Sequence, residues 1–392
     1  MTEQAVIANN ESEEAQSGIV LKEIKQVIYD SRTEQVYKIW LLNLFMNIMT
    51  LGIYSFWGKT RLRQYIVGSF SLHGDRFEYT GTGKELFFGF LKAVTVLLGI
   101  YAPFMIATLN APDAAWPALF LITVIYVIPV ALYSALRYRL SRLDWRGIRF
   151  RLTGSSLNYA NLYIWRGVLD IISLGILLPY SDIKKYRHKV ENSSYGDIPF
   201  SFEGHGKNLM NIHLATYAIA IGLLFMMLLG LQLIAVSFPY TDFSMAPQGI
   251  SALAVQSMPE ENSLPLLSEK SVFITAVTFI LLPFLLFPLV RLMYKTALIH
   301  EMINHSHVAG IGFRSTVTTL ALVKLKLGNF FIIIGTLGIG APYIMQRNLR
   351  FFANHMQIKG DPETSKIRQI TDQKPADAEG LHETLNLDAD LI

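Results

Sequence analysis

The chain has 392 residues, of which 52% are hydrophobic and only 16% are charged, whereas soluble domains carry about 25% charged residues. This composition excludes an ordinary soluble domain and indicates a polytopic membrane protein. The net charge of +4 is small, and the absence of cysteine excludes disulfides, thiol catalysis and cysteine-ligated zinc.

The two ends of the chain are predicted to be disordered tails. Residues 1–20 are polar and acidic and contain no apolar signal-peptide core. Residues 357–392 are also polar and contain Pro362 and Pro375. We therefore expect a single membrane domain at residues 21–356.

An eight-residue motif occurs at residues 50–57, 173–180 and 336–343. Each copy reads hydroxyl residue, Leu, Gly, Ile, two variable residues, Phe or Pro, and an aromatic residue. Each copy ends an apolar run and is followed by basic residues. The repetition divides the membrane domain into units at residues 21–156 and 157–315, with a closing segment at residues 316–356.

Two segments after the first and second motifs are predicted to form small β-hairpins. Residues 72–84 and 195–207 share a Gly-Asp turn signal, alternating aromatic residues and a final Gly-x-Gly-Lys. A phosphate-binding loop would have Ser or Thr after the lysine, but Glu85 and Asn208 stand there. We therefore interpret Gly-x-Gly-Lys as part of a hairpin turn.

Four apolar runs are predicted to cross the bilayer, which takes about 20 residues in a helix. They lie at residues 86–109, 116–136, 209–236 and 271–290. The loop inside each pair of runs lacks arginine, whereas basic residues follow each pair. The positive-inside rule then predicts that both termini are cytoplasmic.

The middle motif segment, residues 157–180, has predicted cytoplasmic residues on both sides and therefore cannot cross once. We predict that all three motif segments are re-entrant or interfacial, sheltered by the full spans. The alternative is that all three cross, which would give seven helices. The expected fold class is an all-α polytopic membrane protein with four full transmembrane helices, three repeated re-entrant or interfacial segments and small cytoplasmic β-hairpins.

Two stretches of this sequence resemble a known family. Residues 51–61 read Leu-Gly-Ile-Tyr-Ser-Phe-Trp-Gly-Lys-Thr-Arg, and residues 74–86 read Gly-Asp-Arg-Phe-Glu-Tyr-Thr-Gly-Thr-Gly-Lys-Glu-Leu. They resemble the YjgN family of bacterial inner-membrane proteins, a domain of unknown function, and the resemblance covers about residues 20–356. It implies a multi-pass inner-membrane location, but no activity and no functional residues.

The candidate site residues belong to the motifs and to the charges around them. Broken helices of this kind surround substrate sites in transporters, although the glycine also suits close helix packing and the aromatic residue suits the membrane interface. The basic residues suit anionic headgroups or an anionic solute, or plain anchoring. The candidates are Gly52, Trp57, Arg61, Arg166, Asp170, Gly175, Pro179, Tyr180, Gly338, Pro342, Tyr343 and Arg347. Arg166 and Asp170 are four residues apart and would share a helix face within the membrane.

Residues 300–307 contain the one metal-like cluster, with Glu301, His305 and His307. The spacing is not the His-Glu-x-x-His of metalloproteases, so we predict a polar helix end, no metal and no cofactor.

The leading functional hypothesis is a transporter or channel for a small solute. The alternative is a non-catalytic membrane scaffold or lipid-binding, stress-related protein with a basic cytoplasmic face. An enzyme is the least favoured class, because no Ser/His/Asp set or carboxylate pair has an informative spacing. Expected partners are membrane lipids and a small solute, without nucleic acid. The sequence leaves the substrate, energy coupling and oligomeric state open.

Overall fold

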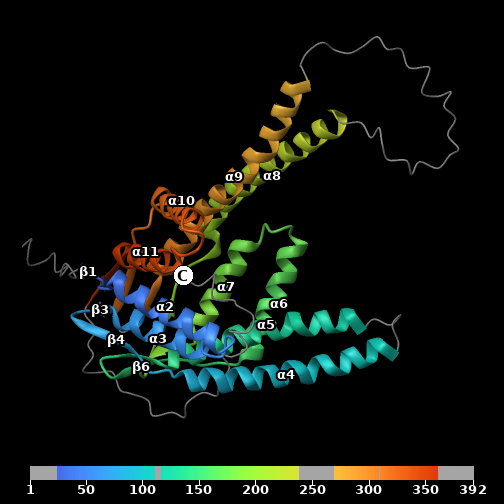
Figure 1. Cartoon of the computed structure of the whole chain (residues 1–392). Helices are drawn as coiled ribbons and strands as arrows, with labels where there is room; N and C mark the ends of the chain where they lie inside the picture. The colour runs from blue at the N-terminus through green and yellow to red at the C-terminus, as the bar shows by residue number, and fades with distance from the viewer. Residues whose placement is uncertain (1–23, 111–115, 238–268, 309, 361–392) are drawn as a thin grey trace, which may run out of the picture. The chain divides into compact units, whose positions relative to one another are not determined.

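The computed structural model describes residues 24–110, 116–237, 269–308 and 310–360 (Figure 1). Within these residues, four helices are long and apolar enough to cross a membrane, in agreement with the four predicted apolar runs. They are α4 (Gly83–Asn110), α5 (Trp116–Ser141), α8 (Gly206–Ser237) and α9 (Glu269–Asn304). The predicted N-terminal tail and residues 361–392 lie outside the described residues.

The chain divides into two compact units. The smaller unit, Met210–Ala297, contains most of α8 and α9. Within it, the ring of His213 meets the ring of Tyr294 edge-on, with their centroids 5.1 Å apart. A Cβ on Gly230 would lie 3.0 Å from the carbonyl oxygen of Ala276, so this glycine lets the two helices approach closely.

The larger unit runs up to Leu209 and resumes at Leu298. It contains three helical pairs, each broken at one copy of the motif (Figure 1). The pairs are α2 (Thr33–Met49) with α3 (Ser55–Gly68), α6 (Ser156–Ile172) with α7 (Leu178–Glu191), and α10 (Thr319–Gly335) with α11 (Ala341–His355). Helix α11 packs against α2, and α5 packs against α6.

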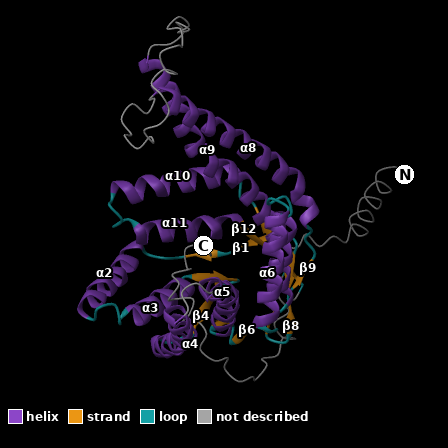
Figure 2. Cartoon of the chain, turned by 90° about the vertical axis from the view of Figure 1, so that its right-hand side faces the viewer, coloured by secondary structure: helices purple, strands orange, loops and turns teal. Residues whose placement is uncertain are grey.

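The strands of this unit form two antiparallel sheets, which Figure 2 shows gathered together beside the helices. The larger sheet, in spatial order, is β2 (Ile28–Tyr29), β3 (Phe70–Leu72), β4 (Asp75–Tyr79), β5 (Leu143–Trp145), β6 (Ile148–Leu152), β7 (Ser193–Tyr195) and β8 (Ile198–Pro199). The smaller sheet is β1 (Ile24–Gln26), β12 (Met356–Lys359), β11 (Ile311–Ser315), β10 (Ser306–Val308) and β9 (Ser201–Phe202).

The two sheets join at both ends through continuous chain. Val27 alone separates β1 from β2, and Phe200 alone separates β8 from β9. The order of neighbouring strands therefore closes on itself as a ring, the arrangement of a barrel, although β1, β2, β8 and β9 each pair with a strand on one side only.

Side chains from both sheets fill the interior of this barrel. Leu72, Trp145 and Tyr195 from the larger sheet cluster with Ile311 and Ile358 from the smaller one. The hydroxyl of Tyr195 donates a 2.8 Å hydrogen bond to the carbonyl oxygen of Trp145. Burial raises the pKa of Tyr195 to about 12, so this donor keeps its proton at neutral pH.

The all-α description is therefore too simple, because the predicted hairpins are parts of two sheets. The turn of the first hairpin is made by His73 and Gly74, whose φ angles of 54° and 86° suit a two-residue turn. The segment that contains Gly147 was not predicted as a hairpin, but it connects β5 to β6. The predicted C-terminal tail is also wrong at its start, because residues 357–359 belong to β12.

The interpretation of Gly-x-Gly-Lys as a hairpin turn is wrong as well. Gly83 begins α4, and Gly206 begins α8. A Cβ on Gly83 would lie 2.8 Å from the Cα of Trp57, and a Cβ on Gly206 would lie 2.8 Å from the Cα of Tyr180. These glycines therefore allow the start of α4 to touch the helical pair α2–α3 and the start of α8 to touch the helical pair α6–α7.

Candidate functional site

The three motif turns have the same backbone geometry. Their leucines have φ angles of 49°, 51° and 50°, and their glycines 89°, 85° and 90°. A left-handed backbone conformation is unfavourable for leucine, whereas the glycine that follows adopts it at low cost. These residues are Leu51 and Gly52, Leu174 and Gly175, and Leu337 and Gly338.

The hydroxyl residue at the start of each motif has a common role. The side-chain oxygens of Thr50, Ser173 and Thr336 accept hydrogen bonds from backbone N–H groups four residues further on, at 2.9, 3.2 and 2.8 Å. Each residue also ends the first helix of its pair. One side chain thus satisfies a free donor at the start of the second helix.

The tips of the helical pairs carry exposed apolar side chains. Leu51, Leu174 and Leu337 are 94%, 76% and 92% exposed. The first helix of each pair adds further exposed side chains, including Phe45, Ile48, Trp165, Ile171, Phe331 and Ile334. Apolar surface of this extent marks a protein–protein or membrane contact.

Polar side chains lie between the two helices of each pair. The amide of Asn43 donates to the carbonyl oxygen of Gly58 at 3.0 Å. The carboxylate of Asp170 accepts from Ser181 Oγ at 2.5 Å and lies 3.7 Å from Lys185 Nζ. In the third pair, the corresponding contacts are Asn329 Nδ2 to Asn348 Oδ1 at 2.7 Å and Arg347 Nη1 to Asn329 Oδ1 at 3.3 Å.

The predicted grouping of Arg166 with Asp170 takes a different form. Asp170 is bound to Lys185 and Ser181 on the facing helix α7. The Nε atom of Arg166 is buried and makes no hydrogen bond with the described residues. The spacing of residues along one helix could not predict the contact between Asp170 and Lys185, because it forms only where the turn brings α7 back against α6.

The other predicted residues have identifiable places at the three turns. Trp57 and Tyr180 pack against the glycines that begin α4 and α8. Pro179 and Pro342 stand in the first turn of α7 and α11, where a proline costs no hydrogen bond. Arg61 and Tyr343 are exposed. The candidates are thus distributed over three turns, and none of them lines the cavity described next.

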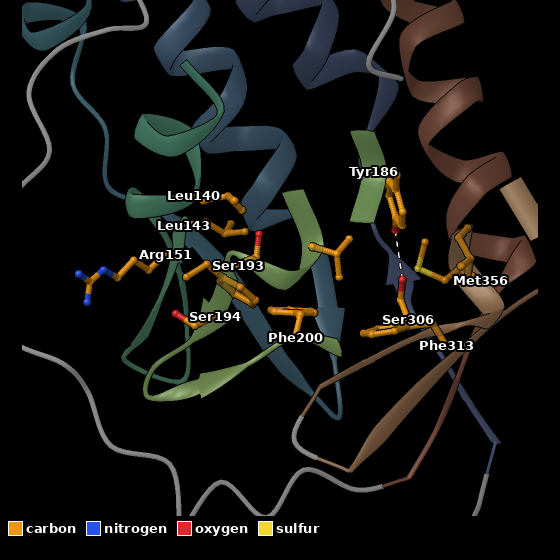
Figure 3. Close-up of a pocket in the computed structure, with 13 residues that line it drawn as sticks. Leu140, Leu143, Arg151, Tyr186, Ser193, Ser194, Phe200, Ser306, Phe313 and Met356 are labelled. Atoms are coloured by element: carbon orange, nitrogen blue, oxygen red, sulfur yellow. Dashed lines mark hydrogen bonds between the residues drawn. The ribbon is translucent and has the colours of Figure 1, made fainter. Parts of the chain in front are cut away.

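A cavity of about 320 Å³ lies where the barrel meets the ends of several helices. It is lined from both sheets and from the C-terminal ends of α5, α7 and α9, by residues that include Leu140, Tyr186, Phe200, Ile303, Ser306 and Phe313. Figure 3 shows Tyr186 and Ser306 joined by a hydrogen bond, whereas Arg151 extends away from the group. Sequence reasoning missed this cavity, because its walls come from segments that only the barrel brings together.

Glu301 of the metal-like cluster serves a helix start. Its Oε1 accepts hydrogen bonds from the backbone N–H of His205 at 2.7 Å and from Asn208 Nδ2 at 2.9 Å. Both donors stand at the beginning of α8, where a carboxylate favours the helix dipole. Among the residues that the structure describes, no group of three side chains is arranged to hold a metal ion.

A family model described as "Bacterial protein of unknown function (DUF898)" matches residues 25–384. The chain is also similar to "Inner membrane protein YjgN" of Salmonella typhimurium (strain LT2), with 23% identity over 89% of this chain and 91% of the relative. The chain belongs to the YjgN family. Its similarity to the YjgN protein of Escherichia coli O157:H7 is 25% identity over 38% of this chain, a match that spans 36% of that relative's length. No solved structure matches the chain.

Proposed function

We propose that this YjgN-family chain is a non-enzymatic, lipid-binding scaffold of the bacterial inner membrane. In this proposal the three helical pairs (α2–α3, α6–α7 and α10–α11), called hairpins from here on, enter the cytoplasmic leaflet and return. The observation that carries the proposal is the shared turn, which exposes Leu51, Leu174 and Leu337 at the three tips. Four apolar helices in the same chain and relatives named as inner membrane proteins support the location.

The lengths within each pair suit entry into one leaflet. Helices α2, α6 and α10 each have 17 residues, or about 25 Å, so each would lie at a slant within a leaflet about 15 Å deep. Lys59 follows Gly52 by seven positions, or about 10 Å of helix. With Lys59 at the headgroups, the tip would lie within the nearer leaflet, which is about 15 Å deep.

The basic residues of the second helices support contact with anionic headgroups. Arg61, Lys184 and Arg347 stand at the same place in the three motif copies. Arg61 and Lys184 are exposed, whereas Arg347 contacts Asn329. Cations at the cytoplasmic surface are attracted to anionic lipids, and the positive-inside rule places both termini on the same side. Membrane lipids are the partners of this proposal, and it includes no nucleic acid.

Cysteine labelling tests the hairpin topology directly, because the chain has no native cysteine. Ser155→Cys and Glu191→Cys would mark the two ends of the middle hairpin, and Ile176→Cys its tip. In oriented vesicles, both end positions should react with a membrane-impermeant maleimide from the cytoplasmic side alone. The tip should react with a membrane-soluble maleimide and be protected from the impermeant one.

Labelling of Ser155→Cys and Glu191→Cys from opposite sides would show a spanning segment and would rule out the re-entrant hairpin. Ile53→Cys and Ile339→Cys extend the test to the other two tips, and the repeat predicts the same result at all three. Reversal of the charges at Arg61 and Lys184 to glutamate should lower the amount of anionic lipid that co-purifies with the protein. Unchanged lipid content would contradict the headgroup contact.

A transporter is the second candidate, favoured by the ion pair between Asp170 and Lys185. Their side chains are 13% and 17% exposed, in a helical pair whose first helix and tip expose apolar side chains. Ionisable residues at membrane depth often mark an ion or substrate pathway. Ion flux into proteoliposomes that is lost in Asp170→Asn would favour transport. Equal background leakage with the unsubstituted protein and with Asp170→Asn would favour the scaffold proposal.

A further inference from the structure

We infer that the cavity between the barrel and the C-terminal ends of α5, α7 and α9 binds a small neutral amphiphile, with an apolar body of about a dozen heavy atoms and one hydroxyl group. This site is separate from the three hairpin tips, and its ligand does not follow from the lipid-scaffold proposal. The inference combines the size of the cavity, the chemistry of its lining and the direction of its polar groups.

The size of the cavity limits the size of its ligand. An apolar cavity of roughly 150 Å³ takes up benzene, with its six heavy atoms. A volume of about 320 Å³ therefore suits a molecule of about a dozen heavy atoms, at the lower end of the roughly 300–1,000 Å³ range of ligand sites. A single chain of about ten carbons fills this volume, whereas the rest of a phospholipid would lie outside it, through the open side of the cavity.

The lining is mostly apolar and presents no charge to the interior. Leucine, phenylalanine, valine, isoleucine and methionine side chains form most of the wall. Arg151 is the one charged lining residue, and its guanidinium points away from the other lining side chains (Figure 3). A charged ligand group would lose its hydration without gaining a partner, so the site favours a neutral molecule.

Two hydroxyls of the wall, those of Tyr186 and Ser306, can together bind one ligand hydroxyl. Ser306 Oγ donates to the carbonyl oxygen of Met302 at 2.7 Å, which uses its one proton. In the 3.2 Å contact between the two hydroxyls, Tyr186 must therefore be the donor and Ser306 the acceptor. The Tyr186 oxygen keeps its acceptor capacity and can receive a hydrogen bond from a ligand hydroxyl.

The position of the cavity gives binding a structural consequence. Leu140 lies near the end of α5 and Ile303 near the end of α9, and both helices are candidate membrane spans. Phe200 lies at the junction of the two sheets, and Phe313 lies in β11. A bound molecule would touch all of these elements at once and hold the helix ends against the barrel.

The test is photolabelling of the full-length protein in lipid nanodiscs with a ten-carbon alcohol that carries a diazirine, followed by mass spectrometry of the labelled peptides. Label should appear in the segments around residues 186–194 and 303–306. The labelling should saturate and should be displaced by decan-1-ol. Decanoate and decyltrimethylammonium should displace the label at least tenfold more weakly than decan-1-ol. Equal labelling of these segments and of lipid-facing helices would overturn the inference.

Two substitutions with matched controls separate the cavity from general partition into lipid. Val190→Phe fills the cavity and should abolish the competed label, whereas Val168→Phe, on an exposed side of α6, should not. Tyr186→Phe should weaken displacement by decan-1-ol about threefold to tenfold and leave displacement by decane unchanged. Tyr65→Phe, whose hydroxyl contacts Arg32 outside the cavity, is the matched control. Competed label that survives Val190→Phe would also overturn the inference.

Discussion

At Gly83 the backbone of α4 comes close to the backbone of Trp57, and the same approach recurs between Gly206 and Tyr180. In both cases, the aromatic residue that ends a motif stands against the glycine that begins the next long helix. Packing between a helical pair and a span thus explains the aromatic position in the first two copies of the motif, whereas Tyr343 of the third copy is exposed. The two contacts make a prediction at the scale of single residues.

Gly83→Ala should lower the stability of the protein by about 1–3 kcal/mol, because its Cβ would overlap with the backbone of Trp57 as well as its ring. Gly99→Ala is the matched control, since Gly99 lies in the same helix and a Cβ there would meet nothing within 4 Å. This control should be neutral or stabilising by up to about 1 kcal/mol. Thermal unfolding in one detergent would compare them, and equal melting temperatures would contradict the contact.

Asp144 carries an unfavourable charge in the barrel wall. It stands directly opposite Glu78 in the β4–β5 pairing. Burial raises the pKa of the Asp144 carboxyl, Arg149 opposes this rise, and Glu78 adds to it. Because the folded state holds this proton more tightly than the unfolded state, the contribution of Asp144 to stability is most favourable at acid pH and is lost as pH rises through the pKa of the folded protein.

Asp144→Asn should therefore raise stability at pH 7 by about 0.5–1 kcal/mol, and the gain should shrink at acid pH. Unfolding curves across that range would measure both effects. Asp75→Asn is the control, because the Oδ2 atom of Asp75 lies 2.6 Å from Nε of Arg146 and its negative charge is stabilised by that contact. A stabilising effect of both substitutions would mean that removal of any acidic residue helps.

At the scale of elements, each helical pair combines an apolar first helix and tip with polar contacts between its two helices. The middle pair tests these contacts, because Asp170 and Lys185 are both largely buried and lie on facing helices. Removal of one partner leaves the other charge uncompensated. Removal of both partners avoids that penalty.

Asp170→Asn and Lys185→Met should each cost about 3 kcal/mol, and the double variant should cost clearly less than the sum. Equilibrium unfolding in nanodiscs gives the coupling energy. Glu34 and Lys38 supply the control cycle, since their side chains are 75% and 72% exposed and no measurable coupling is expected. Additive effects at Asp170 and Lys185 would mean that the pair is not a functional unit of the hairpin.

The sequence predicted the long helices well and the strands poorly. The four spans carry a strong apolar signal along their full length. The motif also predicted a break at each glycine, because few other residues accept that backbone conformation. The strands have at most five residues, too few for a clear alternation, and their partners lie far away along the chain. For the same reason, the sequence identified single motif residues but could not predict Lys185 beside Asp170.

At the scale of the whole molecule, the barrel depends on pairing between the first and last described strands. Gln26 in β1 stands opposite Gln357 in β12, and Lys25 stands opposite Ile358. This pairing joins the two ends of the described chain. It also explains why the tail predicted from residue 357 begins with ordered structure.

The double variant Gln26→Cys with Gln357→Cys should form a disulfide readily on oxidation, because directly opposite positions on paired strands have close Cβ atoms. Lys25→Cys with Gln357→Cys is the control, since a shift of one residue places the two side chains on opposite faces. Gel mobility under non-reducing conditions reports the bond. Equal yields in the two variants would contradict the register.

The ring of strands also fixes an order of events during synthesis. Strand β12 leaves the ribosome about 330 residues after β1, which at ~5–20 residues per second is roughly 15–65 s later. During this interval the earlier strands have unpaired edges, and all four apolar helices are translated before β12. Membrane insertion thus comes before closure of the barrel, and a nascent chain that stalls before β12 would present an open edge to chaperones and proteases.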